Sequence, residues 1–232
     1  MTRSGMTFAM PGAVLTLAVC ASLALGQSQS GNVVTSAKYT SPYDAFMKMN
    51  RLPEAFGKGD NGADYWGFLE SRLGNQAGRI LIKRPAKGFS DDAFRGWLSF
   101  MRAYGNATGI GNCVECHRVP DFTDHQKHNI GTAKEPVETP SLRGAASKKS
   151  FFQDGSASTL EEAIARHVAA AQVAQQDKRS GVEVEVGKIA LSEREIGEVA
   201  AFLRSIQEVP REQFRQYLID VVIQPVELDF SD

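Results

Sequence analysis

The chain has 232 residues, of which 42% are hydrophobic and 23% are charged. These proportions are those of an ordinary globular protein, and the length is enough for one or two small domains with their own cores. The formal net charge of −1 excludes a strongly basic surface as the basis of function, so no nucleic-acid partner is expected.

The first 26 residues are typical of an export signal. Arg3 is the only charged residue among them, the apolar run AVLTLAVCASLAL follows, and Ala24-Leu25-Gly26 places small residues at the expected cleavage positions. A retained membrane anchor is the alternative, but the uninterrupted apolar run is shorter than the ~20 residues that a span needs. Cys20, preceded by LAV, leaves lipid attachment open as a minor option. We expect a periplasmic or otherwise exported protein that begins at Gln27 after cleavage.

A linker and an N-terminal helical region are predicted next. Residues 27–40 are small and polar, as linkers are. Residues 41–88 place aromatic and aliphatic side chains three and four positions apart in PYDAFMKMN and GADYWGFLESRLG, which predicts helices in pieces. Because residues 41–88 include no histidine and no cysteine, this region cannot supply a thiolate or an imidazole ligand.

Three further helices are predicted within residues 89–208. Ser90 can cap a helix that runs to about Tyr104, after which the glycine-rich GNATGIGN ends it. The stretch STLEEAIARHVAAAQ begins with Ser158 and has Glu161 three residues later, which is the pattern of a capping box.

The third helix repeats this device in SEREIGEVAAFLRSI, with Ser192 and Glu195 as the capping pair. Between the second and third helices, QQDKRSGVEVEVGK is predicted to be a solvated loop with a short strand pair. The tail, residues 209–232, contains REQFRQYLIDVVI, which is compatible with a helix or a strand.

Cys113, Cys116 and His117 form the pattern C-x-x-C-H, the attachment sequence of c-type haem. The two thiols add to the vinyl groups of the porphyrin, and the adjacent histidine lies under the iron as the proximal ligand. In an exported chain this pattern predicts one covalent haem c.

Two alternatives use the same cysteines. Cys113, Cys116, His125 and His128 could form a zinc site, but the two histidines are closer in sequence than zinc ligands usually are, and His117 is left without a role. A thioredoxin-like redox pair would need a strand–helix setting and no haem histidine.

The sixth iron ligand has to be found among histidines, because all six methionines precede Cys113. His125 and His128 lie close to the attachment site in a stretch with turn character. His167 lies on the apolar stripe of a predicted helix, where a polar side chain needs a reason for burial. We therefore expect His167 as the distal ligand. The alternatives are a hydrogen-bonded core histidine and a sixth position that is empty or holds water.

Several ordered motifs resemble the C-terminal haem domain of the bacterial dihaem cytochrome c peroxidases. They are CVECHRVPDFTDHQKHNIG, ETPSLRGAASKKSFFQDGSASTLEEAI and LSEREIGEVAAFLRSI, and together they cover about residues 105–208. The resemblance implies that this domain takes electrons in and that its distal ligand lies on the helix opened by the TLEEA-like stretch, where His167 matches. It also implies that Arg143 lies beside a haem propionate, a contact suited to a guanidinium. The alternative for Arg143 is an ordinary surface charge.

The chain also departs from this family. The peroxide-reacting haem of the family sits in an N-terminal domain with its own C-x-x-C-H, whereas this chain has one such motif. Gln153 stands where relatives often carry histidine before Asp-Gly. These departures favour electron transfer over peroxidase chemistry.

The predicted fold class is mostly α: a cytochrome c-like helical haem domain with an added N-terminal helical region. The expected function is one-electron transfer by an exported monohaem c-type cytochrome with bis-histidine ligation and a redox partner protein. No small-molecule substrate is firmly implied. The alternatives are a single-haem peroxidase and a haem protein that senses a small ligand. The predicted segments are a signal peptide at 1–26, a linker at 27–40, a helical region at 41–88, the haem domain at 89–208 and a tail at 209–232.

Overall fold

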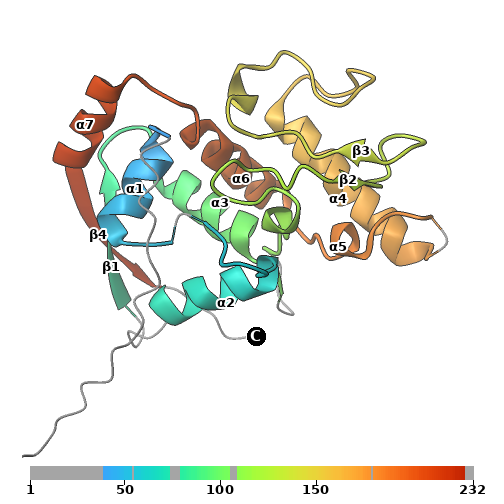
Figure 1. Ribbon diagram of the computed structural model, residues 1–232, viewed down its shortest axis with the longest axis horizontal. Coiled ribbons are helices and arrows are strands. Elements are labelled where there is room, and N and C mark those ends of the chain that lie inside the picture. Colours follow the sequence, from blue (N-terminus) through green and yellow to red (C-terminus); the bar gives the residue numbers. More distant parts are fainter. Residues whose placement is uncertain (1–38, 54, 74–78, 105–108, 179, 228–232) are drawn as a thin grey trace, which may run out of the picture. The chain divides into compact units, whose positions relative to one another are not determined.

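Helices α3 (Asp91–Met101) and α6 (Glu193–Ser205) cross at the centre of the fold (Figure 1). The computed structural model describes residues 39–227 except 54, 74–78, 105–108 and 179. Seven α-helices and two small antiparallel sheets make up this part of the chain. The predicted mostly α-helical fold class is confirmed. The expected signal peptide at 1–26 and most of the expected linker lie outside the described residues.

Both central helices begin where the sequence predicts. The Ser90 hydroxyl accepts a hydrogen bond from the Ala93 N–H, and Ser192 forms the predicted capping box with Glu195. Helix α3 ends at Met101, three residues earlier than predicted. Gly96 permits the close crossing, because a Cβ atom at this position would lie 1.9 Å from the Glu198 carbonyl oxygen.

The region before residue 89 contributes α1 (Pro42–Asn50) and α2 (Gly62–Leu73), as predicted. A capping box of Ser41 and Asp44 begins α1. On its buried face Phe46 stacks on Phe89 with a centroid separation of 4.5 Å. Tyr43 packs edge-on against Phe202 of α6. The hydrophobic core is therefore continuous across the boundary placed at residue 88.

The predicted N-terminal helical region, 41–88, also contains a strand, which the sequence did not indicate. Residues Arg79–Pro85 form strand β1, which pairs with β4 (Val221–Glu227) in antiparallel register, with Ile82 opposite Gln224 (Figure 1). Leu81 is exposed and Ile82 is buried, the alternation of a half-buried strand. The pairing partner lies ~140 residues away, which no local pattern reveals. The tail, for which the sequence allowed a helix or a strand, contains one of each: helix α7 (Arg211–Ile219) is followed by β4.

Helix α4 (Leu160–Gln176) begins one residue later than its predicted capping box requires. Thr159, and not Ser158, accepts the hydrogen bond from the Glu162 N–H, while the Ser158 hydroxyl and N–H both donate to the Glu162 carboxylate. The Ser158–Glu161 box is thus replaced by the adjacent Thr159–Glu162 set, because the two neighbouring residues Ser158 and Thr159 can each act as a cap.

The remaining elements of the fold are short. The loop after α4 contains helix α5 (Val184–Gly187) in place of the predicted strand pair. Strands β2 (Lys127–His128) and β3 (Val137–Glu138) form the second sheet, and two 3₁₀ turns, η1 and η2, span Cys113–Glu115 and Ala145–Ser147. Across the described ranges, no helix combines the length and the apolar character that crossing a membrane would require.

Candidate functional site

The attachment motif forms a tight turn at one wall of a cavity. Asn112 adopts a left-handed conformation (φ 49°) before η1, and the His117 N–H closes the turn on the Cys113 carbonyl at 2.8 Å. The Cys113 thiol donates to the Gly111 carbonyl at 3.3 Å. A Cβ atom at Gly111 would lie 2.4 Å from the Ser99 carbonyl oxygen, so glycine is needed where this turn approaches α3.

The cavity has a volume of about 450 Å³, within the range of roughly 300–1,000 Å³ typical of ligand and cofactor sites. Its walls come from α3, α4, α6 and the segment between β2 and η2. Apolar side chains dominate the lining, among them Phe100, Leu142, Ile164, Val199 and Leu203. Such walls exclude water from whatever the cavity holds.

His117 is held in one tautomer. Its Nδ1 lies 3.0 Å from the Phe122 carbonyl oxygen, which can only accept, so Nδ1 carries the proton and Nε2 keeps its lone pair. Burial lowers the pKa of His117 to about 4. The ring is therefore a neutral imidazole at neutral pH, the form that binds a metal.

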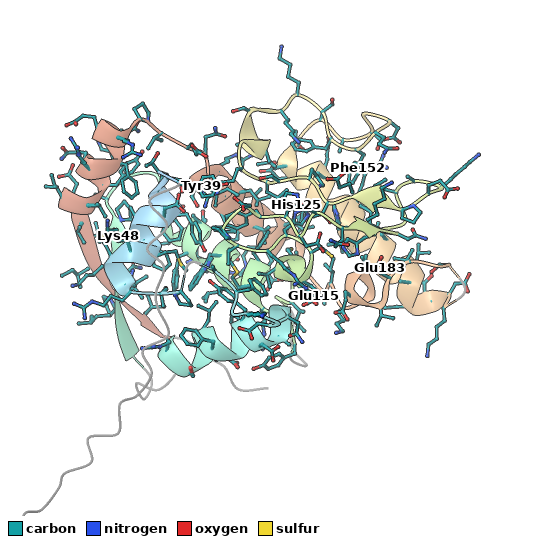
Figure 2. The ribbon with its side chains drawn as sticks, viewed as in Figure 1. Tyr39, Lys48, Glu115, His125, Phe152 and Glu183 are labelled. Carbon is teal, nitrogen blue, oxygen red and sulfur yellow. The ribbon has the colours of Figure 1, made fainter. Side chains whose placement is uncertain are left out.

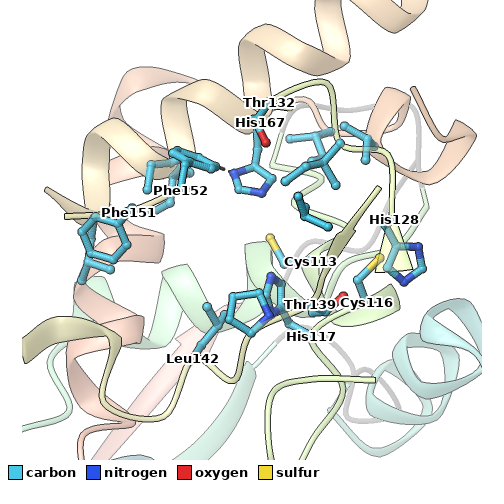
Figure 3. A pocket seen from close by; sticks show the side chains of 18 of the residues that line it. Cys113, Cys116, His117, His128, Thr132, Thr139, Leu142, Phe151, Phe152 and His167 are labelled. Atoms are coloured by element: carbon cyan, nitrogen blue, oxygen red, sulfur yellow. Dashed lines mark hydrogen bonds between the residues drawn. The ribbon is translucent and has the colours of Figure 1, made fainter. Parts of the chain in front are cut away.

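His167 has the same arrangement on the opposite wall. Its Nδ1 donates to the Ala163 carbonyl, one turn earlier in α4, at 2.8 Å, and burial lowers the pKa of its ring. Figure 3 shows the rings of His117 and His167 on opposite sides of the cavity with the Cys113 sulfur between them. With Nδ1 protonated, the lone pair of each ring is on Nε2.

Four of the five predicted site residues thus meet at one cavity: Cys113, Cys116, His117 and His167 all line it. Arg143 does not. Its guanidinium donates to both carboxylate oxygens of Asp44 at 2.8 Å and to the Pro120 carbonyl. A propionate contact by Arg143 stays a prediction; among the described residues, Lys148 is the only lysine or arginine that lines the cavity.

The residues of the zinc alternative do not assemble as that alternative requires. Cys116 and His128 come close together beside Asp124, whereas His125 is exposed. Burial raises the pKa of both Cys113 and Cys116 to about 12, so both are neutral thiols at neutral pH when no metal is bound.

His128 forms hydrogen bonds with two carboxylates. Nε2 lies 2.8 Å from Asp124 Oδ2 and Nδ1 lies 2.6 Å from Glu183 Oε2. Since both partners accept, both ring nitrogens donate and neither offers a lone pair to a metal. Burial opposes the charged ring, but the hydrogen bonds to Asp124 and Glu183 prevail and raise the pKa of His128.

This cluster was not anticipated from the sequence. Asp124 precedes His128 by four residues, which offered a local signal. Glu183 is 55 residues further on, next to α5 (Figure 2), and nothing in the sequence indicates its approach. The sequence likewise did not indicate that the Phe122 carbonyl would fix the tautomer of His117.

Taken together, these residues fit a covalently attached haem. Two thiols stand on a turn with two residues between them, imidazole lone pairs are available on opposite walls, and the cavity between them is apolar. This donor set suits iron in a porphyrin better than a structural zinc ion. The class of protein that the fold and the cavity define is a c-type haem protein.

Comparison with known proteins agrees with this class. Residues 106–216 match the family model described as di-haem cytochrome c peroxidase. The chain is also 26% identical over 137 residues to "Methylamine utilization protein MauG" of Methylorubrum extorquens. The resemblance inferred from the sequence is confirmed for this segment, which the family model matches.

The match is partial on both sides. It covers 51% of this chain and 35% of the relative, so the chain spans about a third of the length of the curated protein that it matches. No solved structure matches the chain.

Proposed function

We propose that the chain is an exported c-type cytochrome that carries single electrons, with one haem bound through Cys113 and Cys116. His117 and His167 would hold the iron from opposite sides. When bound, the haem supplies a reversible one-electron couple between ferric and ferrous iron. The observation that carries the proposal is the pair of facing imidazoles, each with Nδ1 fixed on a backbone carbonyl, which leaves the lone pair on Nε2.

The chain's own residues support this role in three ways. The two cysteines anchor the group so that it cannot dissociate between turnovers. The carbonyls of Phe122 and Ala163 hold both rings in the ligating tautomer without a conformational change. The apolar walls exclude water, and two histidines favour a lower reduction potential than a histidine–methionine pair would.

A redox partner protein in the same compartment is part of the proposal, since an electron carrier needs a donor and an acceptor. The N-terminal pattern before Gln27 supports export. The second candidate is a peroxidase-like or ligand-sensing protein, which the name of the matched family favours. It requires a sixth iron position that opens to small molecules.

Spectra of the holoprotein separate these candidates. With two histidine ligands, the ferric protein is expected to be low-spin in low-temperature EPR. Its ferrous spectrum should not change when carbon monoxide is added. A high-spin ferric signal together with rapid carbon monoxide binding would overturn the electron-carrier proposal in favour of the second candidate.

A further inference from the structure

An ion pair joins the N-terminal region to the segment that follows the attachment motif. Arg143 donates from Nη1 and Nη2 to the two oxygens of Asp44, each at 2.8 Å. The side chains are only 7% and 13% exposed. Asp44 belongs to α1, which lies before residues 106–216 that match the family model. The pair therefore links the haem domain to a part of the chain outside that match.

Arg143 in turn fixes the segment Pro120–Phe122. Its Nε and Nη2 both donate to the Pro120 carbonyl, at 3.1 and 3.0 Å. The guanidinium lies 5.1 Å from the centre of the Phe122 ring and 4.1 Å from that of Tyr39. The Tyr39 hydroxyl donates to the Asp121 carboxylate, and Tyr39 lies next to the start of α1 (Figure 2). Arg143 thus holds the segment through two hydrogen bonds to Pro120 and its contact with the Phe122 ring, and Tyr39 holds it through the hydrogen bond to Asp121.

The same segment presents the carbonyl that orients His117. The Phe122 carbonyl oxygen accepts the Nδ1–H bond of His117 at 3.0 Å. A continuous set of contacts therefore runs from Asp44 through Arg143 and the Pro120–Phe122 segment to His117. We propose that Asp44 and Arg143 are positioning residues for His117, and that the N-terminal region exists in part to set the properties of the proximal ligand.

This inference rests on the proposed role of His117 as proximal ligand. A hydrogen bond from Nδ1–H to a carbonyl increases the basicity of the ring and so favours ferric iron. If the segment loosens, this bond weakens or breaks. The reduction potential should then rise, and the Nδ1 proton of His117 should exchange faster with solvent.

Two variants of the full-length holoprotein test the proposal. Arg143→Lys keeps the charge of the pair but cannot make the paired hydrogen bonds to Asp44 while also donating twice to Pro120. Asp44→Asn keeps the shape of the side chain and removes its charge, and it also changes the capping box that Asp44 forms with Ser41 at the start of α1. The matched control is Asp91→Asn. Asp91 pairs with Arg84 at 2.6 Å, and the other contacts of Arg84 are to Phe89 and Gln224.

The measurements are the midpoint potential and, by paramagnetic proton NMR, the exchange rate of the His117 Nδ1 proton. We expect a higher potential and faster exchange in both variants, with Asp91→Asn unchanged in both. Far-UV circular dichroism identifies any variant that fails to fold, and Arg143→Lys is the milder change. A shift in Asp44→Asn alone, with Arg143→Lys like the parent, would mean that only charge acts and would overturn the positioning role.

Parental values in both variants would also overturn it. These outcomes are distinct from failure of the proposed function. That failure would appear in the parent protein itself, as a haem that is not covalently bound or as a ferric spectrum without histidine ligation.

Discussion

At the scale of single residues, His167 decides between the candidate functions. It lines the cavity from the middle of α4 with its Nδ1 already satisfied by Ala163. His167→Ala should open one face of the iron, giving a high-spin or water-bound ferric spectrum. The variant should also bind carbon monoxide, which we expect the parent not to do.

The other two downstream histidines are the controls for this prediction. His125 is exposed and both nitrogens of His128 are occupied by carboxylates. His125→Ala and His128→Ala should therefore keep the low-spin spectrum. If His167→Ala kept the parental spectrum while one of these controls lost it, the ligand assignment would be wrong.

His128 also predicts a pH dependence of stability. Its pKa is raised in the folded protein because the hydrogen bonds to Asp124 and Glu183 outweigh the effect of burial. A raised pKa means that the folded state binds the proton more tightly than the unfolded state. The stabilisation is then complete below the unfolded value of ~6.5 and disappears as the pH rises through the folded value.

Thermal unfolding across neutral to alkaline pH measures this effect. The melting temperature should fall as the pH rises above 6.5, and His128→Gln should flatten that part of the curve. Asp124 keeps its charge throughout this range, since its pKa is lowered by the Gln126 N–H and by His128 against the opposing effect of burial. An equally steep fall in His128→Gln would assign the dependence to other groups.

At the scale of elements, the crossing of α3 and α6 depends on Gly96. Alanine in place of a helical glycine usually stabilises a helix by about 1 kcal/mol. Here the added Cβ would lie 1.9 Å from the Glu198 carbonyl oxygen, and overpacking costs roughly 1–3 kcal/mol or more. We expect Gly96→Ala to destabilise the protein despite its better helix propensity.

Gly197 is the matched control on α6. A Cβ at this position meets nothing within 4 Å, so Gly197→Ala should stabilise the protein by up to about 1 kcal/mol. Chemical denaturation of both variants gives the comparison. Equal gains in the two variants would show that the helices do not approach as closely as described.

The sequence predicted the elements whose signals are local. Ser90 and the Ser192–Glu195 pair marked helix starts because caps act within four residues. At Ser158 the predicted helix start is wrong by one residue, because the neighbouring Thr159 is the actual N-cap. Strand β1 was missed because its partner β4 lies at the other end of the chain.

In the candidate site too, the residues with local sequence signals were predicted and those that depend on long-range contacts were not. Cys113, Cys116 and His117 are recognisable because haem attachment requires them at a fixed spacing within five residues, and His167 because its neighbours form an apolar stripe. Arg143 could not be placed from the sequence. Its nearest carboxylate belongs to Asp44, 99 residues away, and only the folded chain shows that contact.

At the scale of the whole described unit, the N-terminal region is part of the same core as the haem domain. Phe46 packs against Phe89 and Trp97, and Tyr43 against Phe122 and Phe202. Strands β1 and β4 also join the region before residue 89 to the C-terminal end of the described chain. The region before residue 89 is therefore placed to influence the cavity rather than to act as an independent module.

The number of haems per chain is the prediction that belongs to the whole molecule. After removal of residues 1–26, Cys113 and Cys116 are the only cysteines left, and both line the cavity. A chain with one attachment motif and one such pair should carry one covalent haem. Intact mass spectrometry after acid–acetone extraction should show the mature chain plus the mass of a single haem, with the N-terminus at Gln27.

A double variant, Cys113→Ala with Cys116→Ala, is the control, since it should lose the added mass while His117 and His167 remain. Loss of all haem from the parent under extraction would contradict covalent attachment. Two haems per chain would contradict the monohaem assignment and restore the di-haem arrangement named by the matched family. A lipid-modified Cys20 at the N-terminus would leave the haem count intact but tether the protein to a membrane.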